Sequence, residues 1–494
     1  MKTTRILKKM SSVAGAGKTT ALKRDLKNHV GKKTLLITFN KSLEEEAKPL
    51  EIDFPGLSVS TYHGLAFNSV CKEIGDFTPL SEYKPSTILE LGIKGINSSK
   101  HAVMYIKLIS MYCHSSKTIN KFIGQMVRNE SISAILGKVS EERLRILKEV
   151  WNKLVSLKLL THDAYAKLYQ LQNPTLNFDV IMVDEYQDFS ESMISVIVKG
   201  GKNADIYLAG DDNQRIYEWR GACGVFPLEF NQEEELFASW RCPKEFVEIA
   251  NPYTKRLSGV NMSSNNPNKG EVIIFNDESQ QLDLLEKEDI TFLTRTNSYA
   301  FVIAEKLARM GFNIKMNSNV NVEGLEKHWQ WINGIKTDSY LDDFEATSKD
   351  NLISFYRDTG QDDRIQELNC AMQILDMNFL KEFLVGKISH DMPTATISTV
   401  YRAKGLGFKN VFIASDFKSP LMPEKNNILI TDEDLKLLYV AITRAKEKLY
   451  IGSKYVTDDE VLEIHPDYTF IERQDGEEIL LKKIREATVL KANY

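Results

Sequence analysis

The sequence has few cysteines and no long apolar run, and these two absences narrow the class of protein. Only five of the 494 residues are cysteines, and no two of them form a CxxC pair. We therefore expect no disulfide framework, zinc ribbon or iron–sulfur cluster, and a reducing cytosol fits. No apolar run approaches the ~18–20 residues that span a bilayer, and the basic N-terminal stretch lacks the apolar segment of a signal peptide. The sequence predicts a cytoplasmic protein that does not cross a membrane.

An excess of basic charge is also missing. The 63 Lys and Arg residues are outnumbered by 68 Asp and Glu residues, which gives a net charge of −5. A uniformly basic coat for nucleic acid is therefore excluded, but a basic groove is not, because charge can be distributed unevenly. Hydrophobic residues make up 43% and charged residues 27%, so wholesale disorder is not expected. At ~100–200 residues per domain, the length predicts about three domains.

What the sequence does contain is an alternation of short apolar runs with helical stretches. The runs are rich in β-branched residues and nearly continuously apolar, which is typical of parallel strands covered on both faces. Repeated strand–helix units predict an α/β architecture with parallel sheets. Residues 73–157 and 317–392 break the alternation and are mostly helix-like, which indicates two inserted helical subdomains. The predicted strands are residues 34–39, 179–185, 204–210, 289–295, 395–400 and 410–415.

A phosphate-binding loop is indicated by SVAGAGKT at residues 12–19, between a possible strand and a helical run. Its small residues allow backbone N–H groups to surround phosphate oxygens at a helix N-terminus. Lys18 can reach the β- and γ-phosphates, and the Thr19 hydroxyl can ligate Mg²⁺. Ser12 replaces the usual first Gly, and the alternative is a turn that binds nothing. The nucleotide-binding candidates are Ala14, Gly15, Ala16, Gly17, Lys18, Thr19 and Thr20.

A pair of acidic residues ends the strongest apolar run, in IMVDEYQD at residues 181–188. Asp184 at the C-terminal end of the strand can hold Mg²⁺, and Glu185 can orient and deprotonate an attacking water. Alternatively, the two carboxylates are a solvated pair after a core strand. The phosphate-binding loop elsewhere in the chain favours the catalytic interpretation.

Further motifs follow in a fixed order and resemble those of superfamily 1A helicases of the UvrD/Rep type. The resemblance extends from about residue 5 to 452. THDAYAKLYQL (161–171) also resembles the stretch before DEYQD in F-box DNA helicases. The motifs are STYHGLAF (60–67), LAGDDNQRIYEWRGA (208–222), SWRCP (239–243), FLTRTNSYA (292–300), STVYRAKGLGF (398–408) and LLYVAITRAKEKLYI (437–451).

This resemblance implies an α/β fold of two RecA-like P-loop domains with parallel sheets. Each domain carries an inserted, mainly helical subdomain, in the 1A/1B/2A/2B layout with a reduced 2B. The expected boundaries are residues 1–72 and 158–232 for 1A, 73–157 for 1B, 233–316 and 393–494 for 2A, and 317–392 for the small 2B-like insert.

The resemblance also implies roles for individual residues, with ATP and Mg²⁺ as cofactors. Thr19 and Asp184 would hold the metal, and Gln214 would sense the γ-phosphate. Arg241 and Arg444 would act as arginine fingers, each of which is worth about 10³–10⁵ in rate. The implied catalytic set is Lys18, Glu185, Gln214, Arg241 and Arg444.

Nucleotide specificity is expected to be loose. Trp240 occupies the place of the family's base-stacking Tyr, and a larger ring preserves stacking. The adenine-reading Gln that the family has before the loop is absent, because the first Gln here is Gln125. Gly407 stands where the family has a Glu that contacts the ribose. We therefore predict weak discrimination between purine nucleotides.

A path for single-stranded DNA needs aromatic platforms for bases and donors for phosphates. Phe39, Tyr217 and Trp219 are the candidate platforms. For Phe39 a core position is the alternative, and for His63 a satisfied buried histidine. The candidate donors are Thr38, Asn40, Thr61, His63, Arg220 and Lys404.

Three functions compete. The first is a DNA-stimulated ATPase that translocates 3′ to 5′ by analogy and unwinds DNA. The second is a regulatory subunit that senses NTP and DNA and activates a partner nuclease. The third, another P-loop enzyme such as a kinase, is disfavoured by DEYQD, GDDNQ and the two Arg motifs. The compact chain resembles the helicase-like B proteins of the Gabija anti-phage defence system, which work beside an OLD-type nuclease with a Toprim domain. The implied partners are single-stranded DNA or DNA ends and such a nuclease.

Overall fold

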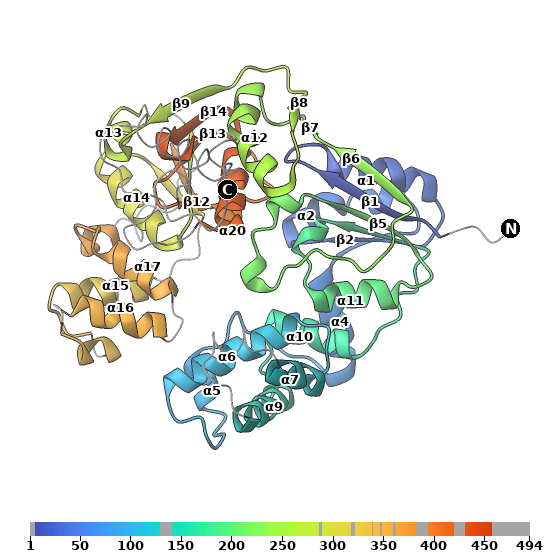
Figure 1. Ribbon diagram of the computed structural model, residues 1–494, viewed down its shortest axis with the longest axis horizontal. Coiled ribbons are helices and arrows are strands. Elements are labelled where there is room, and N and C mark those ends of the chain that lie inside the picture. Colours follow the sequence, from blue (N-terminus) through green and yellow to red (C-terminus); the bar gives the residue numbers. More distant parts are fainter. Residues whose placement is uncertain are drawn as a thin grey trace, which may run out of the picture. The chain divides into compact units, whose positions relative to one another are not determined.

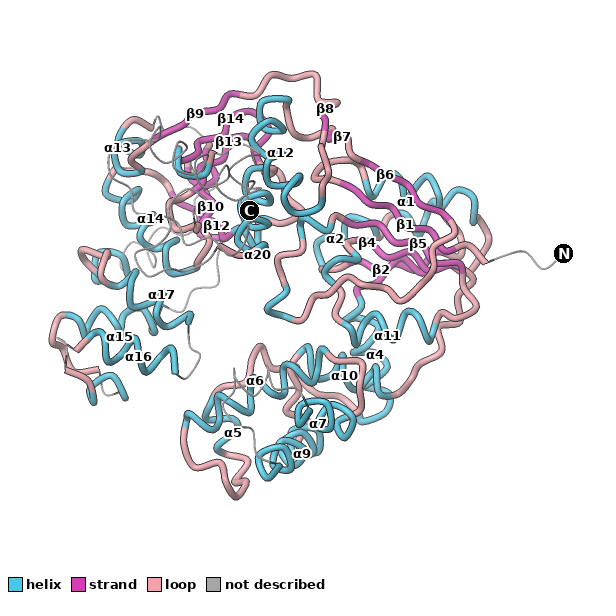
Figure 2. The backbone as a smooth tube through the Cα atoms, viewed as in Figure 1, coloured by secondary structure: helices cyan, strands magenta, loops and turns pink. Residues whose placement is uncertain are grey.

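The computed structural model describes residues 5–128, 141–285, 289–317, 322–337, 339–345, 348–358, 362–381, 394–418 and 430–456. By its internal contacts the chain divides into two compact units. The first contains Met1–Ser12 and Gly17–Leu236, and the second contains Val13–Ala16 and Phe237–Tyr494. Figure 2 shows that each unit is built around one sheet, drawn in magenta, and each of these sheets has six strands. Within the described ranges, no helix has the length and apolarity to cross a membrane.

The sheet of the first unit has the order β3-β2-β4-β5-β1-β6, and every neighbouring pair is parallel. Neighbouring parallel strands cannot be joined by a tight turn, so the chain crosses over from one end of the strands to the other, mostly through helices. The strand order also differs from the order in the sequence. The strands are β1 (Leu7–Ser12), β2 (Thr34–Thr38), β3 (Leu57–Thr61), β4 (Val180–Asp184), β5 (Asp205–Gly210) and β6 (Gln232–Leu236).

Helices cover both faces of this sheet (Figure 1). Successive side chains of a strand point to opposite faces. Leu35 and Ile37 of β2 therefore join the core under α4 (Tyr62–Ile74), α10 (His162–Leu171) and α11 (Glu191–Gly200). Leu36 joins the smaller core under α1 (Lys18–Leu26) on the other face. Two short helices, α2 (Lys41–Ala47) and α3 (Leu50–Asp53), connect β2 to β3.

Residues between α4 and α10 form the helical insert of the first unit. It contains α5 (Pro85–Leu89), α6 (Ser99–His114), α7 (Ile119–Arg128) and α9 (Glu141–Ser156). Tyr112 of α6 and Trp151 of α9 meet edge to face, with ring centroids 5.1 Å apart. The core of this insert is continuous with the core beneath the sheet, where α10 packs against α4, α6 and α11.

The sheet of the second unit has the order β11-β12-β10-β13-β14-β9, again with parallel neighbours. Its strands are β9 (Glu271–Phe275), β10 (Ile290–Thr294), β11 (Ile314–Asn317), β12 (Ala395–Thr399), β13 (Phe408–Ile413) and β14 (Ala445–Gly452), and β7 (Ala238–Ser239) pairs separately with β8 (Ser263–Ser264). The surrounding helices are α12 (Lys244–Ser258), α13 (Glu278–Asp283), α14 (Asn297–Arg309), α19 (Val400–Ala403) and α20 (Asp432–Ile442).

Between β11 and β12 the second unit carries its own helices, α15 (Val322–Ile332), α16 (Lys349–Asp358) and α17 (Asp362–Ala371). They enclose a small core of Trp331, Leu341, Leu352, Tyr356 and Leu368. The predicted α/β class is thus confirmed, with two parallel RecA-like sheets and a mainly helical insert in each. The domain boundaries expected from the sequence stay predictions.

Candidate nucleotide site and nucleic-acid groove

The candidate nucleotide residues of the first unit lie at one edge of its sheet. Lys18 begins α1, after β1 and the glycine-rich loop, Asp184 ends β4, and Asp211 directly follows β5. These three strands are parallel neighbours, so their carboxyl ends lie at the same edge. In open α/β sheets this edge is where ligands bind. The topology therefore brings residues nearly 200 positions apart into one cluster.

Lys18 is paired with the candidate catalytic base. Its Nζ lies 3.1 Å from Glu185 Oε1. Burial is the largest single influence and opposes the lysine charge, but Glu185, Asp211 and Asp184 together outweigh it, so the pKa of Lys18 is raised. The ammonium is therefore held fully charged where a polyphosphate would need it.

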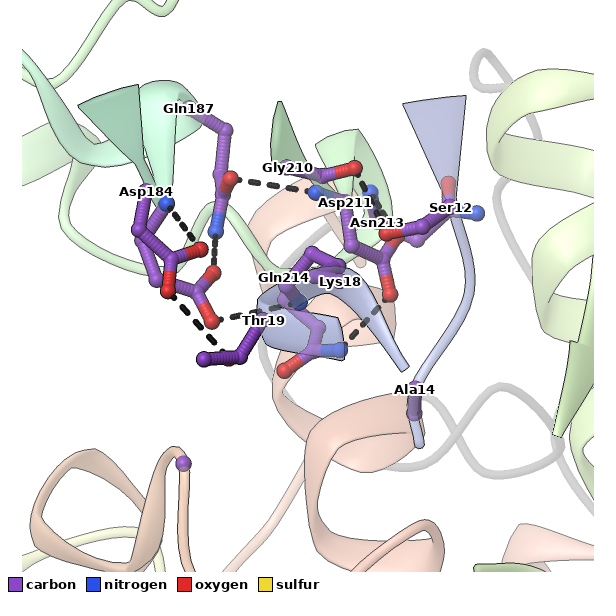
Figure 3. A network of polar contacts seen from close by, with 12 residues as sticks. Ser12, Ala14, Lys18, Thr19, Asp184, Gln187, Gly210, Asp211, Asn213 and Gln214 are labelled. Atoms are coloured by element: carbon purple, nitrogen blue, oxygen red, sulfur yellow. Dashed lines mark hydrogen bonds and ion pairs between the residues drawn. The ribbon is translucent and has the colours of Figure 1, made fainter. Parts of the chain in front are cut away.

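A glutamine that the sequence analysis did not single out links the acidic residues (Figure 3). Gln187 donates from Nε2 to Glu185 Oε2 and accepts at Oε1 from the Asp211 N–H at 3.0 Å. Gln214 in turn donates from Nε2 to Asp211 Oδ2 at 2.7 Å. The base and the candidate γ-phosphate sensor are thus joined by one chain of hydrogen bonds. Its place in DEYQD was the only signal for Gln187.

The backbone of Glu185 is in the left-handed region, with φ 55° and ψ 44°. For a residue other than Gly, such a conformation costs of order 1–3 kcal/mol and concentrates at functional sites. Here it turns the chain sharply after β4, so that Glu185 faces Lys18 while Asp184 faces Thr19.

Asp184 and Thr19 fit the requirements of a magnesium ion. The Thr19 hydroxyl lies 3.5 Å from Asp184 Oδ2. Burial, and then the neighbouring charge of Glu185, raises the pKa of Asp184 above its ordinary value. Two crowded, desolvated carboxylates are an arrangement that a bound cation relieves. Mg²⁺ is usually bound by one or two protein carboxylates together with substrate phosphates.

The middle of the glycine-rich loop, Val13–Ala16, belongs to the second unit. There the Ala14 N–H donates to the Tyr439 hydroxyl at 2.8 Å, and Ser239 Oγ donates to the Ala14 carbonyl at 2.7 Å. Gly15 has φ 72°, and a Cβ at this position would lie 2.5 Å from the Arg241 Cβ. Only Gly therefore fits this position. Trp240, the candidate base platform, is 66% exposed.

The two candidate arginine fingers differ in their surroundings within the second unit. Arg444 is fully buried and donates to the carbonyls of Val440 at 3.0 Å and Leu406 at 2.9 Å. Arg241 is partly exposed and donates to the Gly405 carbonyl at 3.4 Å. Both roles stay predictions.

Four of the predicted DNA contacts line one pocket of the first unit. Its volume is about 430 Å³, and it lies at the carboxyl ends of β2 and β3 and the start of α4. Its lining residues are Phe39, Asn40, Lys41, Thr61, His63, Gly64, Phe67, Pro79, His162 and Tyr165.

His63 is one of the polar residues that line this pocket. Burial lowers its pKa to about 4, so the imidazole is neutral at pH 7. Its Nε2 is buried and has no hydrogen-bond partner within the described residues. The His63 ring lies 5.9 Å from the His162 ring and 6.0 Å from the Tyr165 ring. Neither His162 nor Tyr165 was predicted as a site residue, and their place in THDAYAKLYQL was the only signal.

Several other candidates already have structural roles. Thr61 and Asn40 accept from backbone N–H groups as the N-caps of α4 and α2. Phe39 and Tyr217 stack on each other, with centroids 5.3 Å apart and an interplanar angle of 26°. Thr38 is buried, and its hydroxyl donates to the Asn40 carbonyl at 3.4 Å.

The remaining candidates are distributed between the two units. Arg220 is exposed and ends η4 (Glu218–Arg220) in the first unit. The side chain of Trp219 lies outside what the structure describes. Thr20 is exposed on the first turn of α1. Lys404, in the second unit, is buried at the end of α19. The assignments of all site residues stay predictions, but those in the pocket and in the nucleotide cluster are brought together.

Several curated relatives of the chain are named as DNA helicases. F-box DNA helicase 1 of Gallus gallus is 28% identical, over 90% of this chain and 47% of its own length. F-box DNA helicase protein 1 of Schizosaccharomyces pombe is 25% identical, over 90% of this chain and 55% of its own. The chain thus spans about half the length of these two relatives. Gabija protein GajB of Bacillus cereus is 24% identical, over 55% of this chain and 63% of its own.

Two family models match the chain in the order expected. The UvrD/REP helicase N-terminal domain matches residues 8–234, and the UvrD-like helicase C-terminal domain matches residues 330–455. The first range contains the Lys18–Glu185 cluster and the pocket around His63, and the second contains Arg444. The chain belongs to the UvrD-like helicases.

Proposed function

We propose that the chain is an ATP-driven motor that moves along single-stranded DNA and separates duplexes. The observation that carries the proposal is the pairing of Lys18 with Glu185 at 3.1 Å, beside Asp184 and Gln214, at the carboxyl edge of the first sheet. A second observation is the pocket around His63, which the same unit forms with aromatic and polar residues. Nucleotide hydrolysis and strand binding would thus share one rigid framework.

In the proposed reaction, Glu185 accepts a proton from the water that attacks the γ-phosphate. Glu185 is paired with Lys18. A triphosphate would compete for the Lys18 ammonium and free the carboxylate to act as a base. Gln187 holds the other oxygen of Glu185 and orients it. Gln214, tied to Asp211, would report whether the γ-phosphate is present.

Thr19 and Asp184 would hold Mg²⁺, which would neutralise phosphate charge when bound. Arg241 and Arg444 would neutralise charge that develops on the transferred phosphoryl group, a role that rests on their places in the family motifs. The Trp240 indole, largely exposed, would stack on the base.

On the DNA side, we propose that the pocket around His63 receives the strand. Stacking on an aromatic side chain is worth about 1–3 kcal/mol per base and is tolerant of sequence. The Phe39–Tyr217 pair offers such a surface, and Arg220 and Lys404 would contact phosphates. Translocation would run 3′ to 5′, as the family resemblance implies. The pocket contains neutral imidazole and not a dense basic patch, which agrees with the net charge of −5.

A second candidate function is regulatory, and the similarity to Gabija protein GajB favours it. In this alternative the chain senses nucleotide and DNA ends, separates strands little, and activates an OLD-type nuclease with a Toprim domain in a cytoplasmic anti-phage complex. The nucleotide cluster would be the same, but hydrolysis would control the partner.

Two measurements separate these functions. ATP hydrolysis is measured with and without single-stranded DNA, and strand displacement is measured on duplexes with a 3′ or a 5′ tail. The motor predicts hydrolysis stimulated by DNA and displacement from the 3′ tail. DNA-stimulated hydrolysis without displacement favours the regulatory function. No DNA dependence in either assay contradicts both.

A further inference from the structure

The C-terminal end of α6 carries a histidine that contacts two other elements of the first unit. His114 Nε2 lies 3.4 Å from Oδ2 of Asp163, in the first turn of α10. On another side, His114 packs against the backbone of Gly221, where an added Cβ would lie 2.5 Å from His114 Cβ and 2.6 Å from Cγ. Gly221 has φ 74° and directly follows Arg220, the last residue of η4. His114 therefore connects α10 to the turn formed by residues 217–221.

The segment directly after His114 is fixed by buried polar contacts. The Lys167 Nζ donates to the carbonyls of Ser115 and Lys117, both at 2.7 Å. Gln170 donates to the Ser116 carbonyl at 3.2 Å, and Glu191 accepts from the Ser116 N–H at 3.0 Å. Lys167 is fully buried, and a buried ammonium is costly to leave without its partners. His114 is thus attached to a rigid support.

Asp163 is surrounded by cationic or potentially cationic groups from three other elements. They are His114 of α6, His63 of α4 and Arg220 of η4. Burial raises the pKa of Asp163 most strongly, but the hydrogen bond from His114 and the electrostatic contributions of His114, His63 and Arg220 outweigh burial, so the pKa is lowered. A carboxylate that is charged at neutral pH therefore attracts both His114 and Arg220.

We propose that Asp163 and His114 are positioning residues that hold the turn at residues 217–221, and with it Arg220, in the geometry that binds single-stranded DNA. The proposal rests on the proposed function, in which Arg220 contacts the strand. Asp163 acts through charge on Arg220 and His114, and His114 acts through its packing against Gly221. Neither side chain needs to touch DNA.

The test is a double-mutant cycle on binding of fluorescein-labelled oligo(dT), measured by fluorescence anisotropy. Asp163→Asn keeps the shape and removes the charge, and we expect it to raise the Kd about 5–20-fold, which lies within the range of interaction energies found for coupled neighbours. In an Arg220→Ala background the same substitution should change the Kd less than about twofold. A residue with a merely structural role would weaken binding equally in both backgrounds.

Two controls accompany the cycle. Asp205→Asn is comparable, because it also removes a carboxylate charge that is paired with a cation, Lys32, at 3.5 Å. Asp205 begins β5, at the amino end of the strands, so this substitution should leave the Kd unchanged. Hydrolysis of ATP without DNA should be the same in Asp163→Asn as in the natural sequence. An unchanged Kd in Asp163→Asn, or an equal loss in both backgrounds, overturns the proposal.

Failure of the proposed function can be told apart from failure of this inference. If the natural sequence does not bind oligo(dT), the proposed function fails, and the turn is examined by hydrogen exchange. The amides of Arg220, Gly221 and Ala222 are hydrogen-bonded to carbonyls of the same turn. Faster exchange of these amides in Asp163→Asn, but not in Asp205→Asn, supports the positioning role. Unchanged exchange overturns it.

Discussion

Single residues of the candidate sites were predictable from motifs, whereas the residues that position them were not. Lys18, Asp184 and Glu185 belong to motifs whose chemistry dictates residue type and spacing. Gln187 and Asp163 owe their roles to partners far along the chain, at Asp211 and His114. No local pattern contains such a pairing, because it arises only when strands and helices distant in sequence meet.

Substitution of the ion pair separates binding from chemistry. We expect Lys18→Ala to reduce turnover by about 10²–10³-fold, because it removes a charge aimed at the phosphates. Glu185→Ala should reduce turnover by about 10²–10⁴-fold, since it removes the base. Only Lys18→Ala should also weaken nucleotide binding strongly, measured by calorimetric titration with ATP.

The control for this pair is Lys27→Ala, which removes an exposed lysine directly after α1. It should leave both turnover and affinity unchanged. Hydrolysis that persists in Glu185→Ala would show that another group accepts the proton.

Loose purine specificity is a second expectation at the residue scale. A site that hydrogen-bonds a group of its substrate discriminates by about 10⁴–10⁵ in kcat/KM against an analogue that lacks this group. Here the base-reading Gln of the family is absent, because the first Gln is Gln125, and Gly407 has no carboxylate to contact the ribose. An indole such as Trp240 stacks on either purine. We therefore expect kcat/KM for ATP and GTP to differ by less than about tenfold. A large preference for ATP would contradict this expectation.

Among the structural elements, six interior strands were predicted, whereas β1 was only a possible strand and the interior strand β14 and the edge strands were not predicted. The six predicted strands correspond to β2, β4, β5, β10, β12 and β13, all in the interior of their sheets. The edge strand β6 reads QEEEL, a charged sequence that lacks the apolar signal. Charge on an edge strand prevents pairing with strands of other chains. The same charge removes the apolar pattern from which a strand is predicted.

The end of β5 gives a prediction about packing. A Cβ on Gly210 would lie 2.6 Å from the ring of Tyr186 and closer still to Gln187 Oε1. We expect Gly210→Ala to destabilise the first unit by about 1–3 kcal/mol through overpacking, and to lower ATP hydrolysis because Gln187 is displaced. Calorimetric unfolding and steady-state hydrolysis measure the two effects. Gly124→Ala, on an open helix surface, is the control and should not destabilise the protein.

The edge strand β6 is tied to the sheet by charge, which predicts a dependence on pH. Arg24 donates to both carboxylate oxygens of Glu234, at 2.8 and 2.6 Å, and Lys8 lies 2.7 Å away. The hydrogen bond from Arg24, and then the one from Lys8, lowers the pKa of Glu234 to about 2. The depressed pKa adds stability above the ordinary pKa of about 4.5, and this stability is lost as the pH falls toward 2.

Substitution of Glu234 tests this dependence. With solvent screening, Glu234→Gln should cost about 1 kcal/mol at pH 7, and the difference from the natural sequence should shrink below about pH 4.5. Thermal unfolding of the two proteins at several pH values measures it. Glu233→Gln, exposed on the same strand, should have little effect at any pH. A difference that does not depend on pH would contradict the charge argument.

At the scale of the whole molecule, the negative net charge is compatible with a DNA-binding site that is confined to one pocket. A net charge of −5 excludes only a uniformly basic surface, and the candidate DNA pocket is local, lined mainly by aromatic and neutral polar groups. The alternation of strands and helices predicted an α/β architecture with parallel sheets, and the family resemblance implied that there are two of them. It could not predict that Val13–Ala16 is grouped with the second unit, because that grouping depends on contacts with Ser239 and Tyr439, more than 200 residues away.

The central claim is that the nucleotide cluster and the DNA pocket are coupled in one motor. The most direct measurement is steady-state ATP hydrolysis with increasing oligo(dT), for the natural sequence and for Lys18→Ala. We predict hydrolysis that rises with oligo(dT) to a plateau in the natural sequence and remains at background in Lys18→Ala. Hydrolysis that is independent of oligo(dT), or that persists in Lys18→Ala, would contradict the account.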